Sequence, residues 1–278
     1  MLEECLRRVY WHYYGSWNGW NDDADPTARL AYKLKGLSTP PLVVGNIVHL
    51  ILGRWLRTHI SGEPFPLERL TAEAMAEFDR PAKPVVYWSD VYSDGLDAEL
   101  ISEARNRVRW LLQRASGNSY IRRLARIPSD RIVLADETRW ADKKVDYCDI
   151  DLYGMPDFLA YSENGSPNFI DWKTGRGEAK DAEAQMGAQA LFAREKFGIQ
   201  LSSARAHIVY LDSGDVTLID NLEAAATEAA ALVDSFITDM RRRLSDPDGN
   251  VAGDMERFPM SGDHGRCKLC NFKKLCNR

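Results

Sequence analysis

The pattern of apolar and polar positions predicts a chain of alternating helices and short strands. Apolar residues recur with a helical period in several stretches, and the strongest of these begins at Pro41 and ends before Gly62. Shorter apolar runs, several bounded by Gly, Pro or Asn, predict strands in the second half of the chain. The expected helices cover residues 27–35, 41–60, 67–78, 97–114, 120–127, 180–197 and 222–244, and the expected strands cover 131–134, 138–140, 158–161, 169–172, 206–211 and 216–219.

Two of these strands, 158–161 and 169–172, flank a turn and predict a β-hairpin that carries polar residues at its open end. Alternate residues of a strand share a face, so Asp171 and Lys173 point in the same direction. Asp157 joins them only if it lies opposite residue 171 or 173, whereas a tight two-residue turn would pair it with the residue between them. We therefore expect a loop of odd length or a β-bulge in this hairpin.

The three side chains suggest a chemistry. Two carboxylates that converge, here Asp157 and Asp171, bind a hard divalent cation such as Mg²⁺ or Mn²⁺. A neighbouring lysine, here Lys173, orients or helps to deprotonate a metal-bound water and stabilises charge that develops on a phosphate. The pattern is thus typical of metal-dependent phosphodiester hydrolysis. The alternative is a solvated Asp–Lys pair on an amphipathic hairpin.

The motif Pro156-Asp157, followed fourteen residues later by Asp-Trp-Lys-Thr-Gly at 171–175, resembles the PD-(D/E)XK nuclease superfamily and in particular its RecB-like branch. This resemblance implies an α/β, restriction-endonuclease-like fold, with a central mixed sheet of about four or five strands between helices. It also implies a DNA nuclease in which Asp157, Asp171 and Lys173 are catalytic.

The long helix at 41–60 contains a histidine between two small residues. Gly45, His49 and Gly53 fall on one stripe of that helix, so we expect another segment to approach this face closely. A lone histidine in an apolar helix is otherwise a core residue. The RecB-like resemblance includes a Gly-x3-His element that supplies a metal ligand, and it implies that His49 completes a site with Asp157 and Asp171. An imidazole ligand favours Mn²⁺ over Mg²⁺.

Two further polar positions follow from the same resemblance. Gln185 matches the first residue of a Gln-x3-Tyr pair that lies beside the active site in the family, but Gln189 stands where the family has tyrosine. The two glutamines share a helix face, and two exposed glutamines are the alternative interpretation. Glu137 lies just upstream of the hairpin, where related nucleases often have an acidic residue near the site.

The cysteines indicate a second site. Cys267, Cys270 and Cys276 form C-x2-C-x5-C in the tail, and Cys5 near the other end brings the number of thiols to four. Such spacing favours a metal centre over disulfides, with zinc and iron–sulfur as the alternatives. The set is similar to the cluster motif of the AddB nuclease domain and the CRISPR-associated RecB-like exonucleases, which implies a [4Fe–4S] cluster that closes the tail on the N-terminus. Cys148 has no partner by spacing, and we expect a buried thiol.

Composition adds little to these motifs. The chain has 278 residues, 45% of them hydrophobic and 28% charged, and no apolar run long enough for a membrane span or a signal peptide, so we expect a cytoplasmic protein. The net charge of −5 is unlike the basic footprint of many nucleic-acid binders. Arginines nevertheless cluster at 105–109, 122–126 and 241–243, on solvated helix faces or as phosphate contacts.

We expect one nuclease domain over 1–278, divided into 1–62 with the cluster cysteine and the histidine helix, a helical insertion at 63–129, the nuclease core at 130–245 and a cysteine-rich tail at 246–278. The resemblance implies an exonuclease on single-stranded or end-bearing DNA, working beside a helicase or an integrase in DNA processing or antiviral defence. The alternatives are a catalytically silent subunit that binds DNA or protein, and a zinc-stapled structural protein.

Overall fold

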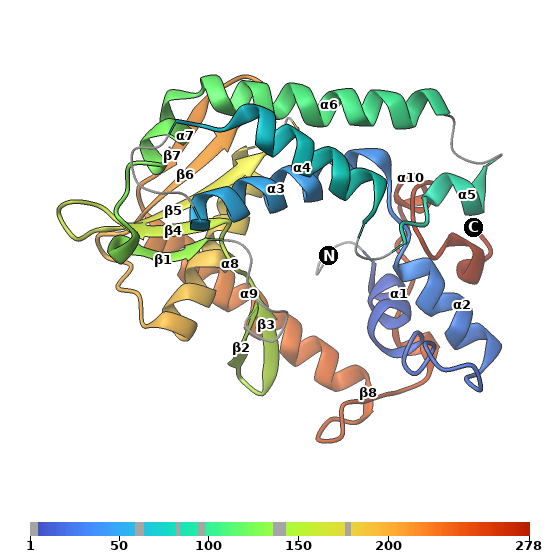
Figure 1. Ribbon diagram of the computed structural model, residues 1–278. Coiled ribbons are helices and arrows are strands. Elements are labelled where there is room, and N and C mark those ends of the chain that lie inside the picture. Colours follow the sequence, from blue (N-terminus) through green and yellow to red (C-terminus); the bar gives the residue numbers. More distant parts are fainter. Residues whose placement is uncertain (1–4, 59–63, 82–83, 94–97, 136–142, 176–178) are drawn as a thin grey trace. The chain divides into compact units, whose positions relative to one another are not determined.

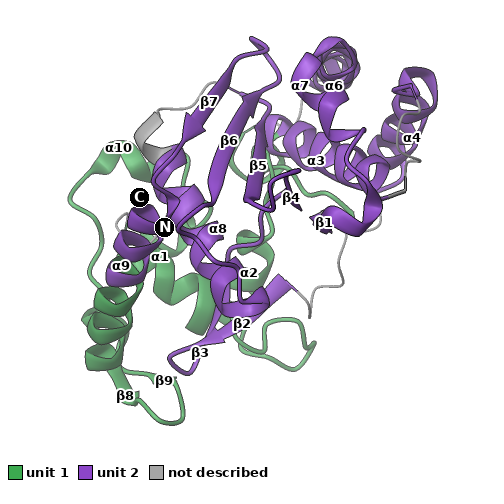
Figure 2. Cartoon of the chain, turned by 90° about the vertical axis from the view of Figure 1, so that its left-hand side faces the viewer, with its two compact units in different colours: residues 1–39, 84–96, 232–278 green, residues 40–83, 97–231 purple. Residues whose placement is uncertain are grey.

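The computed structural model describes residues 5–58, 64–81, 84–93, 98–135, 143–175 and 179–278. The chain forms two compact units, which Figure 2 distinguishes by colour. Unit 1 comprises residues 1–39, 84–96 and 232–278, and unit 2 comprises residues 40–83 and 97–231. Within the described ranges, no helix is both long and apolar enough to cross a membrane. The fourfold division of the chain into 1–62, 63–129, 130–245 and 246–278 stays a prediction.

Unit 2 is built on a mixed five-stranded sheet. The strands are β1 (Ile132–Ala135), β4 (Phe158–Tyr161), β5 (Pro167–Lys173), β6 (Arg205–Tyr210) and β7 (Val216–Ile219), in the order β1-β4-β5-β6-β7. Strands β5 and β6 run parallel, and the other neighbours are antiparallel. This arrangement confirms the expected α/β class with a central mixed sheet.

Helices cover both faces of this sheet. Helices α3 and α6 lie on one side and α8 on the other (Figure 1). Helix α8 is also the crossover that a parallel β5–β6 pair requires. Helix α9 begins in unit 2 and continues into unit 1. The bounds are α3 (Pro40–Thr58), α4 (Leu67–Asp79), α6 (Ala98–Gly117), α7 (Ser119–Leu124), α8 (Ala179–Phe197) and α9 (Leu222–Arg243).

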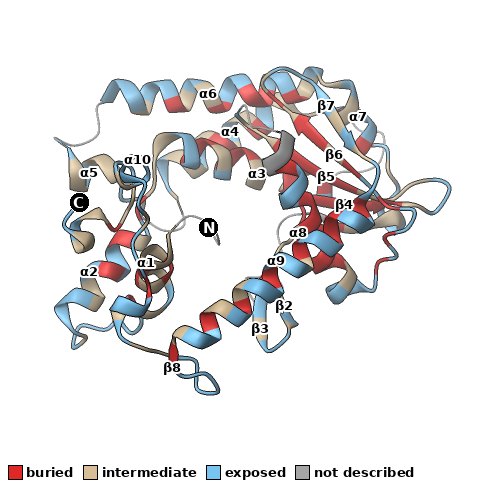
Figure 3. Ribbon diagram, turned by 180° about the vertical axis from the view of Figure 1, so that it is seen from behind, coloured by how far each residue is buried: buried red, intermediate tan, exposed pale blue. Residues whose placement is uncertain are grey.

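The core of unit 2 lies between these layers. Figure 3 shows the buried residues concentrated on β4, β5 and β6 and on α8. Phe158, Phe169, Ile170 and Trp172 are completely buried. Because both faces of the middle strands are covered, β4 and β5 are buried along most of their length rather than at alternate residues. A polar side chain on β5 is therefore held in a water-poor setting.

The β4–β5 hairpin has the register that the sequence requires. Phe158 pairs with Ile170 and Tyr161 pairs with Pro167, so the five-residue loop 162–166 joins the strands. Gly165 has a φ of 82°, a conformation that favours glycine. The expected loop of odd length is confirmed. If this register is continued by one residue, Asp157 lies opposite Asp171.

A second hairpin, β2 (Lys144–Tyr147) and β3 (Ile150–Tyr153), was not predicted from the sequence. Its turn residues Cys148 and Asp149 have positive φ values of 52° and 66°. Cys148 is exposed at this turn, so the expectation of a buried thiol was wrong, because the side chain of a turn residue points to solvent rather than into the core. The strand predicted at 138–140 lies outside the described residues.

Unit 1 joins the N-terminal segment to the tail. Its elements are α1 (Leu6–Val9), α2 (Pro26–Lys35), α5 (Trp88–Tyr92), β8 (Leu244–Asp246), β9 (Val251–Ala252) and α10 (His264–Cys267). Arg7 Nε donates to the Phe258 carbonyl oxygen at 2.8 Å, and the Arg7 amide donates to the Pro259 carbonyl oxygen at 3.1 Å. Phe258 and Phe272 are buried in this unit. The tail therefore closes on the N-terminal segment, as expected.

A glycine on α8 sets how closely α9 approaches. A Cβ at Gly187 would lie 2.3 Å from the carbonyl oxygen of Ala225, so a methyl group there forces the two helices apart. We expect Gly187→Ala to lower the free energy of unfolding by about 1–3 kcal/mol, measured by urea denaturation. Gly117→Ala on α6 is the control, because nothing lies within 4 Å of its Cβ position. Equal stability of the two variants would contradict this account of the α8–α9 contact.

Candidate active site and cysteine pocket

The first pair of the candidate active site joins α3 to the start of the hairpin. His49 lies on α3 and Asp157 lies one residue before β4, and His49 Nδ1 is 3.0 Å from Asp157 Oδ1. The other oxygen, Asp157 Oδ2, accepts a hydrogen bond of 2.9 Å from the backbone amide of Trp172. Asp157 is thus tied to β5 at the residue between Asp171 and Lys173.

The second group is built on β5 and α8. Asp171 is 1% exposed, and its Oδ1 accepts hydrogen bonds of 3.0 Å from both Gln185 Nε2 and Gln189 Nε2. Its Oδ2 lies 2.7 Å from Lys173 Nζ. These contacts show that Asp171 and Lys173 share one face of β5, as the strand period predicts.

Lys173 completes a closed ring of three side chains. Its Nζ donates to Gln185 Oε1, while the amide of the same glutamine donates to Asp171. The ammonium group therefore has two anchors, one carboxylate and one amide oxygen, although about a quarter of the side chain stays exposed to solvent. Gln185 holds the ammonium and the carboxylate in one fixed relation.

Burial and charge shift the pKa values of the His49–Asp157 pair. Burial alone would lower the pKa of His49, but the facing Asp157 carboxylate outweighs it, and the pKa of His49 lies above its ordinary value. Burial raises the pKa of the Asp157 carboxyl, and the opposing attraction of His49 does not cancel this effect. Both shifts favour a proton held between the two side chains.

Two buried oxygen atoms of the site, Asp171 Oδ2 and Gln189 Oε1, accept no regular hydrogen bond within the described residues. Asp171 Oδ2 faces the Lys173 ammonium in the ion pair. Buried polar atoms of this kind are uncommon in folded proteins. No set of three or more His, Cys, Asp or Glu side chains among the described residues is gathered as ligands of one metal ion.

The structure brings the predicted site residues into two linked groups, His49 with Asp157 and Asp171 with Lys173 and Gln185. Gln189, which the resemblance left without a role, binds Asp171, and its spacing of four from Gln185 was the signal for it. Glu137 lies outside the described residues. The catalytic and metal-binding roles of these side chains stay predictions.

The glycine stripe on α3 meets the segment that follows β5. A Cβ at Gly45 would lie 3.4 Å from Thr174 Oγ1, so the close approach expected at this stripe is confirmed. Gly45 is one helical turn before His49, and Thr174 directly follows Lys173. The helix that carries the imidazole therefore rests against the end of the strand that carries the amine.

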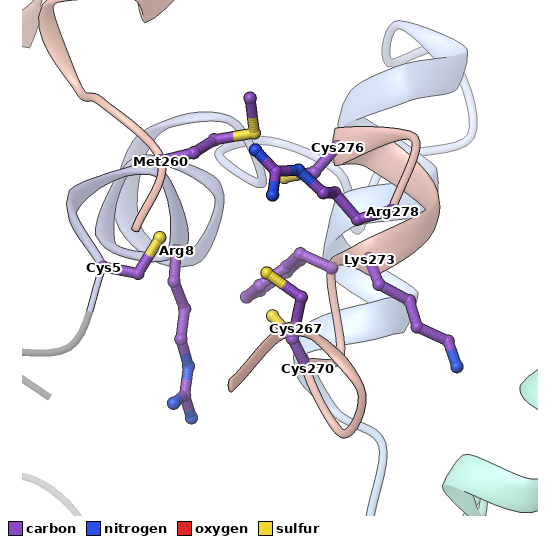
Figure 4. Close-up of a pocket in the computed structure, with 9 residues that line it drawn as sticks. Cys5, Arg8, Met260, Cys267, Cys270, Lys273, Cys276 and Arg278 are labelled. Atoms are coloured by element: carbon purple, nitrogen blue, oxygen red, sulfur yellow. The ribbon is translucent and has the colours of Figure 1, made fainter. Parts of the chain in front are cut away.

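The four predicted thiols lie together in unit 1. Cys5, at the start of α1, and three cysteines of the tail line one pocket, as Figure 4 shows. Burial raises the pKa of the thiols of Cys270 and Cys276, so without a metal these groups favour the protonated form. The three tail cysteines are Cys267, Cys270 and Cys276. The pocket is also lined by Arg8, Met260, Phe272, Lys273 and Arg278.

Comparison with known proteins identifies the family. A family model described as the PD-(D/E)XK nuclease superfamily matches residues 5–277, which is nearly the whole chain. No curated protein matches the chain. The matched range includes the two groups of site residues and the four cysteines of the pocket.

Proposed function

The chain belongs to the PD-(D/E)XK nuclease superfamily, and on this premise we propose that it is a metal-dependent DNA nuclease of the RecB-like branch with an iron–sulfur cluster. The observation that carries the proposal is the contact between Asp171, Lys173 and Gln185, beside the His49–Asp157 pair. Membership of the superfamily supports a nuclease in general. The arrangement of these side chains supports the assignment of their roles.

The residue types of the proposed donor set suit a divalent cation, although no three such side chains among the described residues are gathered around one point. Two carboxylates and one imidazole, from Asp157, Asp171 and His49, are ligands that Mn²⁺ and Mg²⁺ accept, with Mn²⁺ favoured by the imidazole. Within the described residues, Asp171 Oδ2 pairs with the Lys173 ammonium and accepts no further hydrogen bond, so this buried oxygen is available to a cation. When bound, such a cation lowers the pKa of a water molecule and polarises the scissile phosphate.

The protein's own groups supply the remaining chemistry. Lys173 Nζ orients the attacking water and stabilises negative charge that develops on the phosphate. Gln185 keeps the ammonium group beside Asp171 by accepting a hydrogen bond from Nζ and donating one to the carboxylate. Gln189 donates to the same carboxylate oxygen and so fixes its rotamer. The buried position of Asp171 strengthens these electrostatic interactions, because little water screens them.

The cysteine pocket is proposed to hold a [4Fe–4S] cluster with a structural role. Four thiols from opposite ends of the chain line one pocket, and thiolate sulfur is the ligand that such clusters require. The cluster would be held by Cys5, Cys267, Cys270 and Cys276 and would tie the tail to the N-terminal segment. Zinc bound by the same four thiols is the alternative.

The substrate and the partner are proposed from the family resemblance alone. The CRISPR-associated RecB-like exonucleases and the AddB nuclease domain suggest an exonuclease on single-stranded or end-bearing DNA, with a helicase or an integrase as partner. A catalytically silent subunit is the alternative, but retention of both Asp171 and Lys173 in contact with each other favours catalysis.

The direct test is cleavage of DNA by protein purified without oxygen. End-labelled linear single-stranded DNA, linear duplex and circular single-stranded DNA are incubated with Mn²⁺, with Mg²⁺ and with EDTA. We expect the linear substrates to be degraded with Mn²⁺ or Mg²⁺, the circle to survive because it has no end, and EDTA to stop the reaction. Cleavage of the circle would show an endonuclease. Binding of DNA without cleavage in either metal would support the silent subunit.

A further inference from the structure

Helix α6 presents one polar face to the loop between β6 and β7. Arg107 and Arg114 lie seven residues apart on one side of α6, and Asn118 directly follows the helix as the N-cap of α7. Arg114 donates to the Ser213 carbonyl oxygen at 2.9 Å, and Asn118 Nδ2 donates to the Gly214 carbonyl oxygen at 3.3 Å. These side chains therefore bind the loop at successive positions.

Arg107 differs from the other two because it also reaches Thr174, the residue directly after β5. One of its terminal nitrogens lies 3.2 Å from Asp212 Oδ1, and the other donates to the carbonyl oxygen of Thr174 at 3.0 Å. Thr174 directly follows Lys173, and Asp212 directly follows Leu211. The Leu211 amide donates to the Lys173 carbonyl oxygen at 2.9 Å. Arg107 thus binds the two residues that directly follow this hydrogen bond, which joins the end of β5 to the residue after β6.

The guanidinium is itself held in place. It lies over the ring of Trp110 with 4.5 Å to the centroid, which restricts the side chain that bridges Thr174 and Asp212. Thr174 is confined from the other side, because its Oγ1 lies 3.4 Å from the Cβ position of Gly45 on α3. The residue after Lys173 is therefore fixed between two helices, and its backbone carbonyl is fixed by Arg107.

We propose that Arg107 is a positioning residue that fixes the carboxyl end of β5, so that Lys173 Nζ stays between Asp171 and Gln185. This inference rests on the proposed nuclease function, because it assigns Arg107 a task in that site. The ion pair with Asp212 is only half-buried, and by itself it would contribute little. The second bond, to a backbone carbonyl beside the proposed catalytic amine, gives Arg107 this role. The planar fork of arginine makes both bonds at once, whereas the single ammonium of lysine cannot span them.

The test compares Arg107→Met with Arg114→Met. Both variants lose a guanidinium that binds the same loop and contacts the ring of Trp110, but only Arg107 reaches Thr174. Cleavage of linear single-stranded DNA with Mn²⁺ gives kcat and KM, and exchange of the Leu211 amide, followed by NMR, reports opening at the end of β5. Thermal unfolding checks that each variant is folded.

We expect Arg107→Met to lower kcat by about 10-fold to 100-fold with KM nearly unchanged, and to accelerate exchange at Leu211. Arg114→Met should keep the kcat of the parent protein. Arg107→Lys, which retains the charge and one bond, should give an intermediate kcat, and it serves as the folded variant if Arg107→Met is unstable. A raised KM with unchanged kcat would mean that Arg107 contacts substrate, and it would overturn the proposal. Equal losses in the Arg107 and Arg114 variants would also overturn it.

Failure of the nuclease proposal is separable from failure of this one. If the parent protein cleaves no DNA with either metal, the proposed function is wrong, and exchange at Leu211 still decides whether Arg107 fixes the end of β5. Faster exchange in Arg107→Met than in Arg114→Met supports the positioning role. Equal exchange rates in the two variants overturn it.

Discussion

Replacement of Lys173 by methionine is expected to reduce metal-dependent DNA cleavage by at least about 100-fold. Methionine keeps an unbranched apolar stem but removes the ammonium group that pairs with Asp171 Oδ2 at 2.7 Å. The attacking water then loses a group that orients it, and charge on the phosphate loses a nearby cation. Single-turnover cleavage of end-labelled DNA with Mn²⁺ measures the effect on chemistry apart from product release.

The fold should survive this change, because Gln185 and Gln189 still donate to Asp171 Oδ1. Lys196→Met is a matched control on α8. Lys196 donates to the Lys144 carbonyl oxygen at 2.9 Å, and Lys144 is not a residue of the proposed site. We expect this control to cleave like the parent protein. Cleavage by Lys173→Met at the rate of the control would remove Lys173 from the mechanism and leave the Asp171–Lys173 pair with a structural role alone.

The second large effect concerns the cysteine pocket. Protein purified without oxygen is expected to be brown, with broad absorbance at about 400 nm from thiolate-bound iron. Cys270→Ser removes one of the four thiols that line the pocket. We expect the variant to lose at least about nine-tenths of its iron and acid-labile sulfide, because loss of a direct ligand weakens metal binding more than the about 10-fold to 100-fold typical for loss of a residue that only supports a ligand. Metal analysis and the absorbance spectrum measure the loss.

Cys148→Ser is the control for this experiment, because Cys148 is exposed on the β2–β3 turn and is not among the residues that line the pocket. Its iron content should match that of the parent protein. If the cluster holds the N-terminal segment to the tail, urea should unfold Cys270→Ser at a lower concentration than Cys148→Ser. A colourless parent protein that carries zinc would support the zinc alternative, and equal iron in both variants would exclude the pocket as the binding site.

Local sequence patterns were sufficient to locate much of the fold. The helix beginning near Pro41 and the helix α8 were expected from apolar periodicity and are observed with similar bounds. The odd loop between Tyr161 and Pro167 followed from requiring that Asp157 and Asp171 share a face, and the observed register agrees. These predictions succeeded because the helical period and the odd number of loop residues depend only on residues that are close in sequence.

The β2–β3 hairpin shows where local patterns failed. Its turn places Cys148 and Asp149 in the left-handed region without a glycine, so the usual Asn-Gly or Asp-Gly signal is absent. Its strands are short and mix charged with apolar residues, and β2 is held partly by the bond from Lys196 of α8 to the Lys144 carbonyl oxygen. A hairpin supported by contacts from another element gives only a weak signal in its own residues.

The sequence by itself determined the chemistry that is available and the side chains that share a face, such as Asp171 with Lys173 and Gln185 with Gln189. It also determined the number of thiols. Only the tertiary structure decided that His49 reaches Asp157 across 108 positions of sequence and that Arg107 reaches the residue after Lys173. The physical reason is separation along the chain. Strand and helix periods relate residues that are close in sequence, whereas these contacts depend on how α3 and α6 pack against the sheet.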